Sequence, residues 1–476
     1  MADQQIKNAK DYFTEKNNPS FWSGHTGREQ LRSRMGQALP CPACGRVHGI
    51  QTRMIEQAPD MALKIGEYLR ELGLAGRCTV VMDTNTRKAA GEALLEGLAA
   101  FQPRAVVFDR PDLHADEPAL GLLLAELADK PDFLVSCGSG TLTDITRYNS
   151  YMTGIPFVAY ATAPSVDGFA SSSTPLLVRG FKTTYPGVAP VGIFYDAAVL
   201  AAAPRKMTAA GFGDVLAKVI ALIDWRLAYV VEDEDYCPLI ASLVDRAVGD
   251  CLELAADLAE QPEVSKKGAA CACLMETLSM TGIAMQMMGN SRPASGGEHH
   301  ISHLLEMRDI QQHRLGSLHG DKVGIGTLIC LEMYQRLFGG DRLPEQRGIM
   351  PADRWESEVR RVYGPLAAQA LSINESQPPQ GAVWERQKEQ LEKAMQQFGY
   401  AVVRSFETLL PVARDKILAI GGPVRPDQLG YTRQDAYDAI AHGKEVRPKF
   451  TILRLAERFG WLYDLAGEFA DRSGQG

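Results

Sequence analysis

A cluster of histidines is the part of this chain best suited to chemistry. His313 aside, four of the nine histidines lie between positions 299 and 319, namely His299, His300, His303 and His319. Residues four apart share one face of a helix, so we expect His299 and His303 to point the same way. One carboxylate and two imidazoles leave a coordination position open, as a catalytic metal centre requires. The cluster therefore predicts a catalytic metal site.

Two other segments offer ligands for that metal. Asp214 follows a Gly-Phe-Gly run at the opening of a predicted helix, and His319 precedes a glycine. Spacing alone leaves open whether His299 or His303 is a ligand. The other interpretation is that these histidines are polar core residues or face solvent.

A glycine-rich turn predicts a phosphate site. A predicted strand runs into Ser136-Cys-Gly-Ser-Gly-Thr-Leu-Thr-Asp144, and a predicted helix follows. Glycines let backbone N–H groups approach a pyrophosphate, and the helix N-terminus adds the positive end of its dipole. The later glycine of the G-x-G-x-x-G fingerprint is missing, and a tight turn without ligand is the other interpretation. Asp83 ends an earlier strand, where a carboxylate binds an adenosine ribose or caps a helix.

Cys41, Cys44 and His48 form a second metal-binding pattern. A Cys-Pro-x-Cys-Gly turn is typical of one corner of a zinc ribbon, and His25 offers a fourth ligand. No second half of a ribbon stands nearby, so a reduced thiol pair in a loop is the other interpretation. We expect residues 1–50 to be an N-terminal extension with a structural zinc knuckle.

The pattern of apolar residues predicts an α/β segment followed by an all-helical segment, and these elements must position the motifs. A helix is predicted over 54–72, and helical periodicity replaces strand-like runs from about residue 209. We expect a Rossmann-like cofactor-binding domain at 51–205 and a helical metal- and substrate-binding domain at 206–476, with the active site in the cleft between them. Short apolar runs that alternate with helical stretches predict a parallel sheet, with strands at 78–82, 104–108, 132–136 and 155–160.

Composition limits the classes of partner. The chain has 476 residues and a net charge of −8, which argues against general nucleic-acid binding. Nine scattered cysteines are too few for a disulfide scaffold in a chain of this length. The polar segment Met1 to Lys16 lacks the apolar core of a secretion signal, and no apolar run reaches membrane-spanning length. These features predict a cytoplasmic protein with a small-molecule substrate.

Together the motifs resemble the iron-containing alcohol dehydrogenase and dehydroquinate synthase-like superfamily, and within it the bacterial branch of the sn-glycerol-1-phosphate dehydrogenase family. The resemblance spans residues 55–400 and excludes the first 50 residues. It implies a metal-dependent oxidoreductase that interconverts dihydroxyacetone phosphate and sn-glycerol 1-phosphate with NAD(P)H, and a homodimer. The motifs that carry it are Gly138-Ser-Gly-Thr-Leu-Thr-Asp144, Thr162-Ala-Pro-Ser-Val-Asp-Gly-Phe-Ala-Ser171, Gly211-Phe-Gly-Asp214, Ser291-Arg-Pro-Ala-Ser-Gly-Gly-Glu-His-His-Ile-Ser-His303 and Leu318-His-Gly320.

The resemblance also implies roles for single residues. Asp214, His299 and His319 would hold a divalent ion, zinc or nickel with iron as a third choice. His303, Asp167 and Asp214 would contact the substrate and serve catalysis, with His303 as the candidate proton relay. The same resemblance implies cofactor contacts for Gly138, Ser139, Gly140, Thr141, Leu142, Asp144, Thr162, Ala163, Pro164, Ser165 and Ser171. Asp83 joins the predicted cofactor-binding residues because it ends a strand.

Some assignments rest on chemistry alone. The substrate phosphate needs a cation, for which Arg292 and Lys182 are the candidates. Lys218 lies one helical turn after Asp214 and is a candidate to orient its carboxylate. Two other functions stay open: a glycerol or other polyol dehydrogenase on the same scaffold, and a non-catalytic metal-binding regulatory protein that uses the Cys41, Cys44 and His48 cluster.

Overall fold

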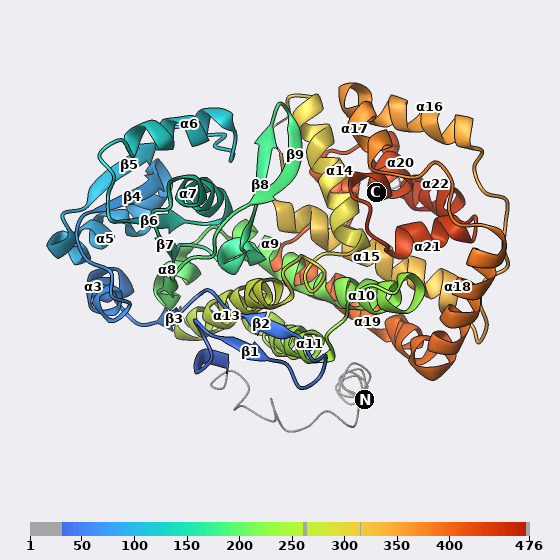
Figure 1. Ribbon diagram of the computed structural model, residues 1–476, viewed down its shortest axis with the longest axis horizontal. Helices are drawn as coiled ribbons and strands as arrows, with labels where there is room; N and C mark the ends of the chain where they lie inside the picture. The colour runs from blue at the N-terminus through green and yellow to red at the C-terminus, as the bar shows by residue number, and fades with distance from the viewer. Residues whose placement is uncertain (1–30, 260–263, 315, 473–476) are drawn as a thin grey trace. The chain divides into compact units, whose positions relative to one another are not determined.

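The computed structural model describes residues 31–259, 264–314 and 316–472 (Figure 1). His25 and the Met1 to Lys16 segment therefore lie outside the described residues. The chain divides into two units, each described by itself below. The sheet unit contains Asn18–Val215 and Arg246–Ser291, and the helical unit contains Leu216–Asp245 and Arg292–Gly476. The domain boundaries at 50 and 205 stay predictions.

The sheet unit is built on six parallel strands in the order β3-β10-β7-β6-β4-β5 (Figure 1). The four strands expected from apolar runs are present, and β3 and β10 extend the sheet at one edge. Their bounds are β3 Met54–Gln57, β4 Cys78–Asp83, β5 Arg104–Phe108, β6 Phe133–Gly138, β7 Phe157–Ala161 and β10 Gly192–Tyr195.

Both faces of this sheet are buried, as strands in a parallel sheet require. Val80 of β4 belongs to an apolar cluster on one face, and its neighbour Val81 belongs to a cluster on the other. Successive side chains of a strand point to opposite faces, which explains this alternation. The covering helices are α3 (Met61–Glu71) and α5 (Glu92–Gly97) on the first face, and α6 (Glu117–Glu126) and α7 (Gly140–Thr153) on the second.

The helix predicted over 54–72 is wrong at its start. Met54–Gln57 forms β3, which pairs in parallel with β10, and α3 begins only at Met61. Pro59 disfavours helical backbone at the residue before it, and Asp60 has a left-handed φ of 56°. The apolar residues therefore have helical spacing only after Asp60, where α3 begins.

The remaining elements of the sheet unit are two hairpins and further helices. The hairpins pair β1 (Ala38–Pro40) with β2 (Val47–Gly49), and β8 (Ser173–Val178) with β9 (Phe181–Pro186). Asp83 precedes the short helix α4 (Thr84–Thr86). Further helices are α8 (Ala197–Ala202), α9 (Arg205–Leu216), α12 (Ala255–Ala259) and α13 (Val264–Met288), while α11 spans Pro238–Glu253.

The helical unit confirms the expected change of texture, because β10 is the last strand among the described residues. Helix α14 packs against both α15 and α20, and α15 packs against α19. The helices of this unit are α10 (Lys218–Glu232), α14 (Gly297–Gln311), α15 (His319–Phe338), α16 (Ala352–Tyr363), α17 (Ala367–Ser372), α18 (Gly381–Ala394), α19 (Tyr400–Ile420), α20 (Arg433–His442), α21 (Ile452–Arg458) and α22 (Leu462–Arg472).

Among the described residues, one helix, Lys266–Met288, is long and apolar enough to span a membrane by length and composition alone. Within the protein, 78% of its most apolar window is buried. This helix packs against α8 and the 3-10 turn Asp167–Ala170. A Cβ at Gly282 would lie 2.7 Å from the Ala170 Cβ, so the glycine permits the close approach. The burial is that of a core helix.

Gly97 provides a test of the packing between α3 and α5. A Cβ at Gly97 would lie 2.1 Å from the carbonyl oxygen of Ala62, so the two helices must separate in Gly97→Ala. We expect this variant to lose about 1–3 kcal/mol of unfolding free energy, measured by urea denaturation. Gly121→Ala on α6 is the control, because a Cβ there meets nothing within 4 Å. Equal stability of the two variants would contradict the packing described here.

Candidate metal centre and nucleotide site

Three imidazoles converge in the helical unit because of where two helices begin. His299 and His303 lie on consecutive turns of α14, and His319 is the first residue of α15. The His299 and His319 ring centroids are 5.3 Å apart. The His303 and His319 rings are stacked, with centroids 5.6 Å apart and planes inclined by 23°. Three nitrogen ligands are thereby gathered from segments separated in sequence.

Glu306 holds two of these rings. Its Oε2 lies 3.0 Å from Nδ1 of His303, and its Oε1 lies 2.8 Å from Nδ1 of His319. A carboxylate that accepts from Nδ1 fixes the tautomer and leaves Nε2 to act as ligand or base. Glu306 therefore orients both imidazoles with one side chain.

Glu298 orients the third imidazole, that of His299. Its Oε1 lies 2.7 Å from Nδ1 of His299 and also accepts the N–H of Gly296 at 2.7 Å. Burial raises the pKa of Glu298 to about 7. Each of the three imidazoles thus has a carboxylate at Nδ1, the arrangement in which protein histidines ordinarily bind metal.

A buried aspartate fixes the first turn of α14. Asp224 Oδ2 accepts the N–H of Gly297 at 2.7 Å, and Oδ1 accepts the N–H of Ile452 at 2.8 Å. Burial, followed by the charge of Glu298, raises the pKa of Asp224 to about 7. The backbone bonds and the Tyr334 hydroxyl compensate the carboxylate for its loss of water. This contact sets where His299 and His303 lie.

One set of ligand atoms in the helical unit is close enough to hold an ion. The ligand atoms of His303, Glu306 and His319 lie within 4.8 Å of one another. Asp214 lies in the sheet unit, so its role as a ligand stays a prediction. The donors are carboxylate oxygen and imidazole nitrogen, which suit zinc, nickel and iron alike. The donor chemistry therefore fits a divalent metal.

Asp214 is also tied to a second residue predicted to act in catalysis. Asp214 lies near the end of α9 and is buried. Its Oδ2 accepts the backbone N–H of Asp167 at 2.9 Å. Gly211, one helical turn earlier, has no room for a Cβ, which would lie 1.8 Å from the Pro164 carbonyl oxygen. The Gly-Phe-Gly run thus lets α9 approach the loop that carries Asp167.

The glycine-rich turn joins β6 to α7 as predicted. Ser139 is the N-cap residue of α7, a helix of 14 residues. A Cβ at Gly138 would lie 2.4 Å from Leu142 Cδ1, and one at Gly140 would lie 3.0 Å from Val166 Cγ2. The bare backbone at these positions forms a cradle that fits a pyrophosphate at a helix N-terminus.

The second predicted cofactor segment lies beside this turn. Thr162 donates its N–H to the Gly138 carbonyl oxygen at 3.1 Å, and the hydroxyls of Ser139 and Ser165 are hydrogen-bonded. Ser171 is placed by a bond from its hydroxyl to the Ser173 carbonyl oxygen at 3.0 Å. The structure thus brings the 138–144 and 162–165 segments together.

Strand order explains why Asp83 belongs near the same place. From β4 the chain continues to β5 on one side, whereas from β6 it continues to β7 on the other. The carboxyl ends of β4 and β6 therefore flank the point where the strand order reverses, where ligands of open α/β sheets bind. Asp83 ends β4, and its Oδ1 accepts the N–H groups of Asn85 and Thr86 at 2.8 and 2.7 Å. The helix-cap role is confirmed, and a ribose contact stays a prediction.

The remaining predicted residues make structural contacts. Asp144 pairs with Arg147, a fully buried arginine. The Arg292 guanidinium is bonded to both carboxylate oxygens of Glu234 and to the Phe450 carbonyl oxygen. Lys182 lies on β9, and Lys218 begins α10 and is buried. Their roles toward a ligand stay predictions.

Sequence reasoning missed Glu298, Glu306 and Asp224. Glu306 lies three residues after His303 and seven after His299, so its place on the same helix face was available from spacing. Asp224 gave no such signal, because its partners Gly297 and Ile452 are distant in the chain. Arg447 and Lys449 were also missed, and they act electrostatically on Glu306 and Glu298 respectively.

Comparison with known proteins shows that this fold is that of the iron-containing alcohol dehydrogenases. Residues 56–204 match the family model described as iron-containing alcohol dehydrogenase. The fold resembles glycerol dehydrogenase from Schizosaccharomyces pombe, with a TM-score of 0.55 and 16% identity over 89% of this chain and 92% of that one. It also resembles a 1,3-propanediol oxidoreductase, with a TM-score of 0.58 and 16% identity over 88% of this chain and 98% of that one.

Curated relatives narrow the class to one family. The glycerol-1-phosphate dehydrogenase (NAD(P)+) of Bacillus licheniformis is 32% identical over 92% of this chain and 97% of the relative. That of Geobacillus stearothermophilus is 34% identical over 89% of this chain and 97% of the relative. The chain belongs to the glycerol-1-phosphate dehydrogenase family.

The shared carboxylate provides a test of the centre. Glu306→Gln keeps the size of the side chain but removes the charge that holds two imidazoles. We expect divalent-metal affinity to fall about 10- to 100-fold, measured by competition with a fluorescent chelator. Glu385→Gln, at an exposed residue of α18 that pairs with Lys388, is the control. Unchanged affinity in Glu306→Gln would show that the Nδ1 contacts do not serve metal binding.

Proposed function

We propose that this protein is a metal-dependent oxidoreductase that interconverts dihydroxyacetone phosphate and sn-glycerol 1-phosphate with NAD(P)H or NAD(P)+. One observation carries the proposal. Three imidazoles with carboxylate partners gather in a chain that is 32% identical over nearly its whole length to a glycerol-1-phosphate dehydrogenase. A homodimer in the cytoplasm is part of the same proposal.

The metal is assigned to Asp214, His299 and His319, with zinc or nickel as the ion and iron as the alternative. Support comes from the family to which the chain belongs and from the His299 and His319 rings, whose centroids are 5.3 Å apart within the helical unit. A divalent ion supplies Lewis-acid polarisation of the substrate oxygen. Glu298 and Glu306 hold the two imidazoles through Nδ1, so their Nε2 atoms are the ligand atoms. Lys218 is proposed to orient Asp214.

We assign the transfer of the hydroxyl proton of the substrate to His303. Its Nδ1 is held by Glu306, which leaves Nε2 to accept the hydroxyl proton of the alcohol or to return it to the reduced carbonyl. Asp167 and Asp214 are assigned to substrate contact, and the Asp167 N–H bond to Asp214 keeps the two together. An imidazole titrates near neutral pH, which suits it to both directions.

The cofactor is assigned to the cradle at the start of α7. Gly138, Ser139, Gly140 and Thr141 present backbone N–H groups for the pyrophosphate, as helix N-termini do. NAD(P)H supplies the hydride. The Thr162–Ser165 segment, Leu142, Asp144 and Ser171 complete the proposed contacts. Asp83 at the strand-order reversal favours NAD, because a carboxylate repels a 2′-phosphate.

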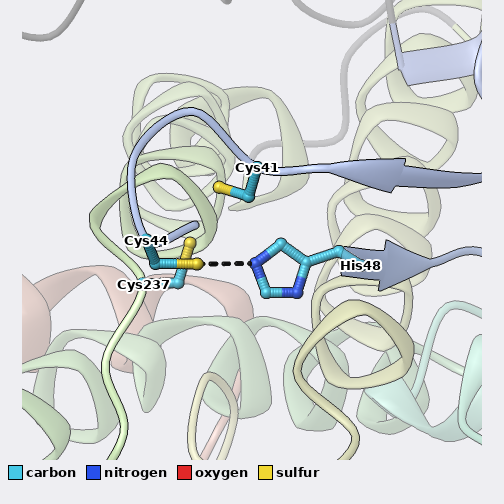
Figure 2. A group of neighbouring side chains, drawn as sticks. All are labelled: Cys41, Cys44, His48 and Cys237. Atoms are coloured by element: carbon cyan, nitrogen blue, oxygen red, sulfur yellow. Dashed lines mark hydrogen bonds between the residues drawn. The ribbon is translucent and has the colours of Figure 1, made fainter. Parts of the chain in front are cut away.

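We expect cationic side chains to bind the phosphate group of the substrate. Arg292 and Lys182 are the predicted candidates, and Arg292 would have to share its guanidinium with Glu234. Arg447 is a further candidate, because it acts electrostatically on Glu306 beside the histidines. Burial lowers the pKa of Arg447, yet an arginine keeps its charge at neutral pH. A second, structural zinc ion at Cys41, Cys44 and His48 is also part of this proposal, supported by the His48 ring, whose Nδ1 lies 2.7 Å from the Met287 carbonyl oxygen and whose Nε2 lies 3.2 Å from the Cys44 Sγ (Figure 2).

The function is tested with stripped and metal-reloaded enzyme. We expect metal-dependent oxidation of NADH or NADPH with dihydroxyacetone phosphate, and a product that an enzyme specific for sn-glycerol 3-phosphate does not consume. Unphosphorylated dihydroxyacetone is the parallel substrate. Turnover of only this substrate would indicate a polyol dehydrogenase, and no turnover with any metal would reject the proposal.

The proton role of His303 is tested by His303→Gln. We expect kcat to fall about 100- to 10,000-fold while metal content stays that of the wild type. His114→Gln, at an exposed histidine of the sheet unit, is the control and should keep full activity. Loss of metal together with activity would instead make His303 a ligand.

A further inference from the structure

Arg147 of α7 is a fully buried cation of the sheet unit that the proposed mechanism does not use. Packing fixes the stem of its side chain. Its Cζ lies 6.0 Å from the centroid of the Phe157 ring on β7, and a Cβ at Gly187 would lie 2.9 Å from its Cδ. Because a charged side chain is seldom buried completely unless it is paired, the contacts of its guanidinium indicate its role.

The two terminal nitrogens of this guanidinium bind two different segments. Nη1 donates to Oδ1 of Asp144, which lies one helical turn earlier on α7. Nη2 donates to the carbonyl oxygen of Gly168 and, at 3.0 Å, to that of Phe169. Asp144 is a proposed cofactor contact, and the two carbonyls belong to the 3-10 turn that begins with Asp167, a proposed substrate contact. One rigid planar group therefore joins the two segments.

The ends of this turn are held by other residues of the same unit. Asp167 donates its N–H to Oδ2 of Asp214 at 2.9 Å, and Nε2 of Gln286 donates to the carbonyl oxygen of Ala170. Arg147 binds the two carbonyl oxygens between these ends. The backbone that directly follows Asp167 is thus fixed by the guanidinium.

The energetics of burial favour a positional role over a stabilising one. Burial lowers the pKa of Arg147, whereas the carboxylates of Asp144 and Asp167 raise it, and an arginine stays charged at neutral pH. Its Nε has no hydrogen-bond partner in the described part of the chain. The desolvation cost of a buried ion pair offsets most of its Coulomb attraction, so such a pair is weak evidence for stability. Its clearest effect is a fixed geometry.

We propose that Arg147 is a positioning residue for hydride transfer, which sets the turn that carries Asp167 relative to the segment of α7 that carries Asp144. The inference rests on the proposed function, because the substrate and cofactor roles of these two aspartates belong to it. A displacement of about 1 Å between reacting groups costs about 100-fold in rate, so loss of this link should lower kcat.

Arg147→Lys tests the positioning role. Lysine keeps a positive charge beside Asp144 but lacks the planar fork that reaches both segments at once. We expect kcat with dihydroxyacetone phosphate to fall about 100-fold, whereas the Kd of NADH, measured by fluorescence titration, changes less than about threefold. Arg104→Lys is the matched control, because Arg104 donates to Glu126 at 2.7 Å at a partly exposed place in the same unit. The control should keep both constants.

Hydrogen exchange provides a measurement that needs no turnover. The Asp167 N–H is bonded to Asp214, and the Ser171 N–H donates to the Gly168 carbonyl oxygen at 3.2 Å. In Arg147→Lys we expect peptides that cover 167–171 to exchange at least about tenfold faster, with β6 and β7 unchanged. If the wild type does not reduce dihydroxyacetone phosphate, the proposed function fails, and exchange over 167–171 still decides the role of Arg147.

A double variant covers the case in which Arg147→Lys does not fold. Arg147→Met combined with Asp144→Asn removes both charges, so no unpaired charge stays buried. We expect the same faster exchange over 167–171, because methionine cannot donate to the two carbonyl oxygens.

Three results would overturn the proposal. The first is wild-type kcat and wild-type exchange in folded Arg147→Lys, and the second is wild-type exchange over 167–171 in the folded double variant. The third is loss of protection across the whole sheet, or failure of both variants to fold, which would make Arg147 a structural residue.

Discussion

The bond between Asp224 and the start of α14 is the constraint on which the candidate metal centre depends. This buried carboxylate accepts the N–H of Gly297 and the N–H of Ile452, and so joins α14 to the segment that begins α21. Because His299 and His303 follow within two turns, their positions are set by this contact. A buried carboxylate is costly to desolvate, and only complete hydrogen bonding makes the arrangement stable.

The close approach of α14 and α15 then brings the third histidine into place. A Cβ at Gly326 would lie 2.6 Å from the Glu298 carbonyl oxygen, so only glycine lets the two helices pack this tightly. The result is that one carboxylate, Glu306, reaches both His303 and His319. A site built on two helix starts is rigid, which favours fixed ligand geometry over adaptable binding.

In the sheet unit, glycines and backbone hydrogen bonds also shape the candidate cofactor site. A pyrophosphate needs backbone N–H groups and little side-chain bulk, and Gly138 and Gly140 at the β6–α7 turn provide both. The reversal of strand order beside β6 brings Asp83 to the neighbouring strand end. The Cys41 turn is also fixed by backbone hydrogen bonds and a glycine, and its histidine is oriented by a carbonyl of α13.

Local pattern in the sequence determined the parallel strands, the helical second half, the glycine-rich turn and the histidines that share a face of α14. These features depend on residues close in the chain, whose spacing reports which side of an element they occupy. Only the tertiary structure decided that Met54–Gln57 is an edge strand, that Asp224 fixes α14, and that a carbonyl of α13 orients His48. Each of these depends on a partner far along the chain, and the spacing of residues within one segment carries no information about such a partner.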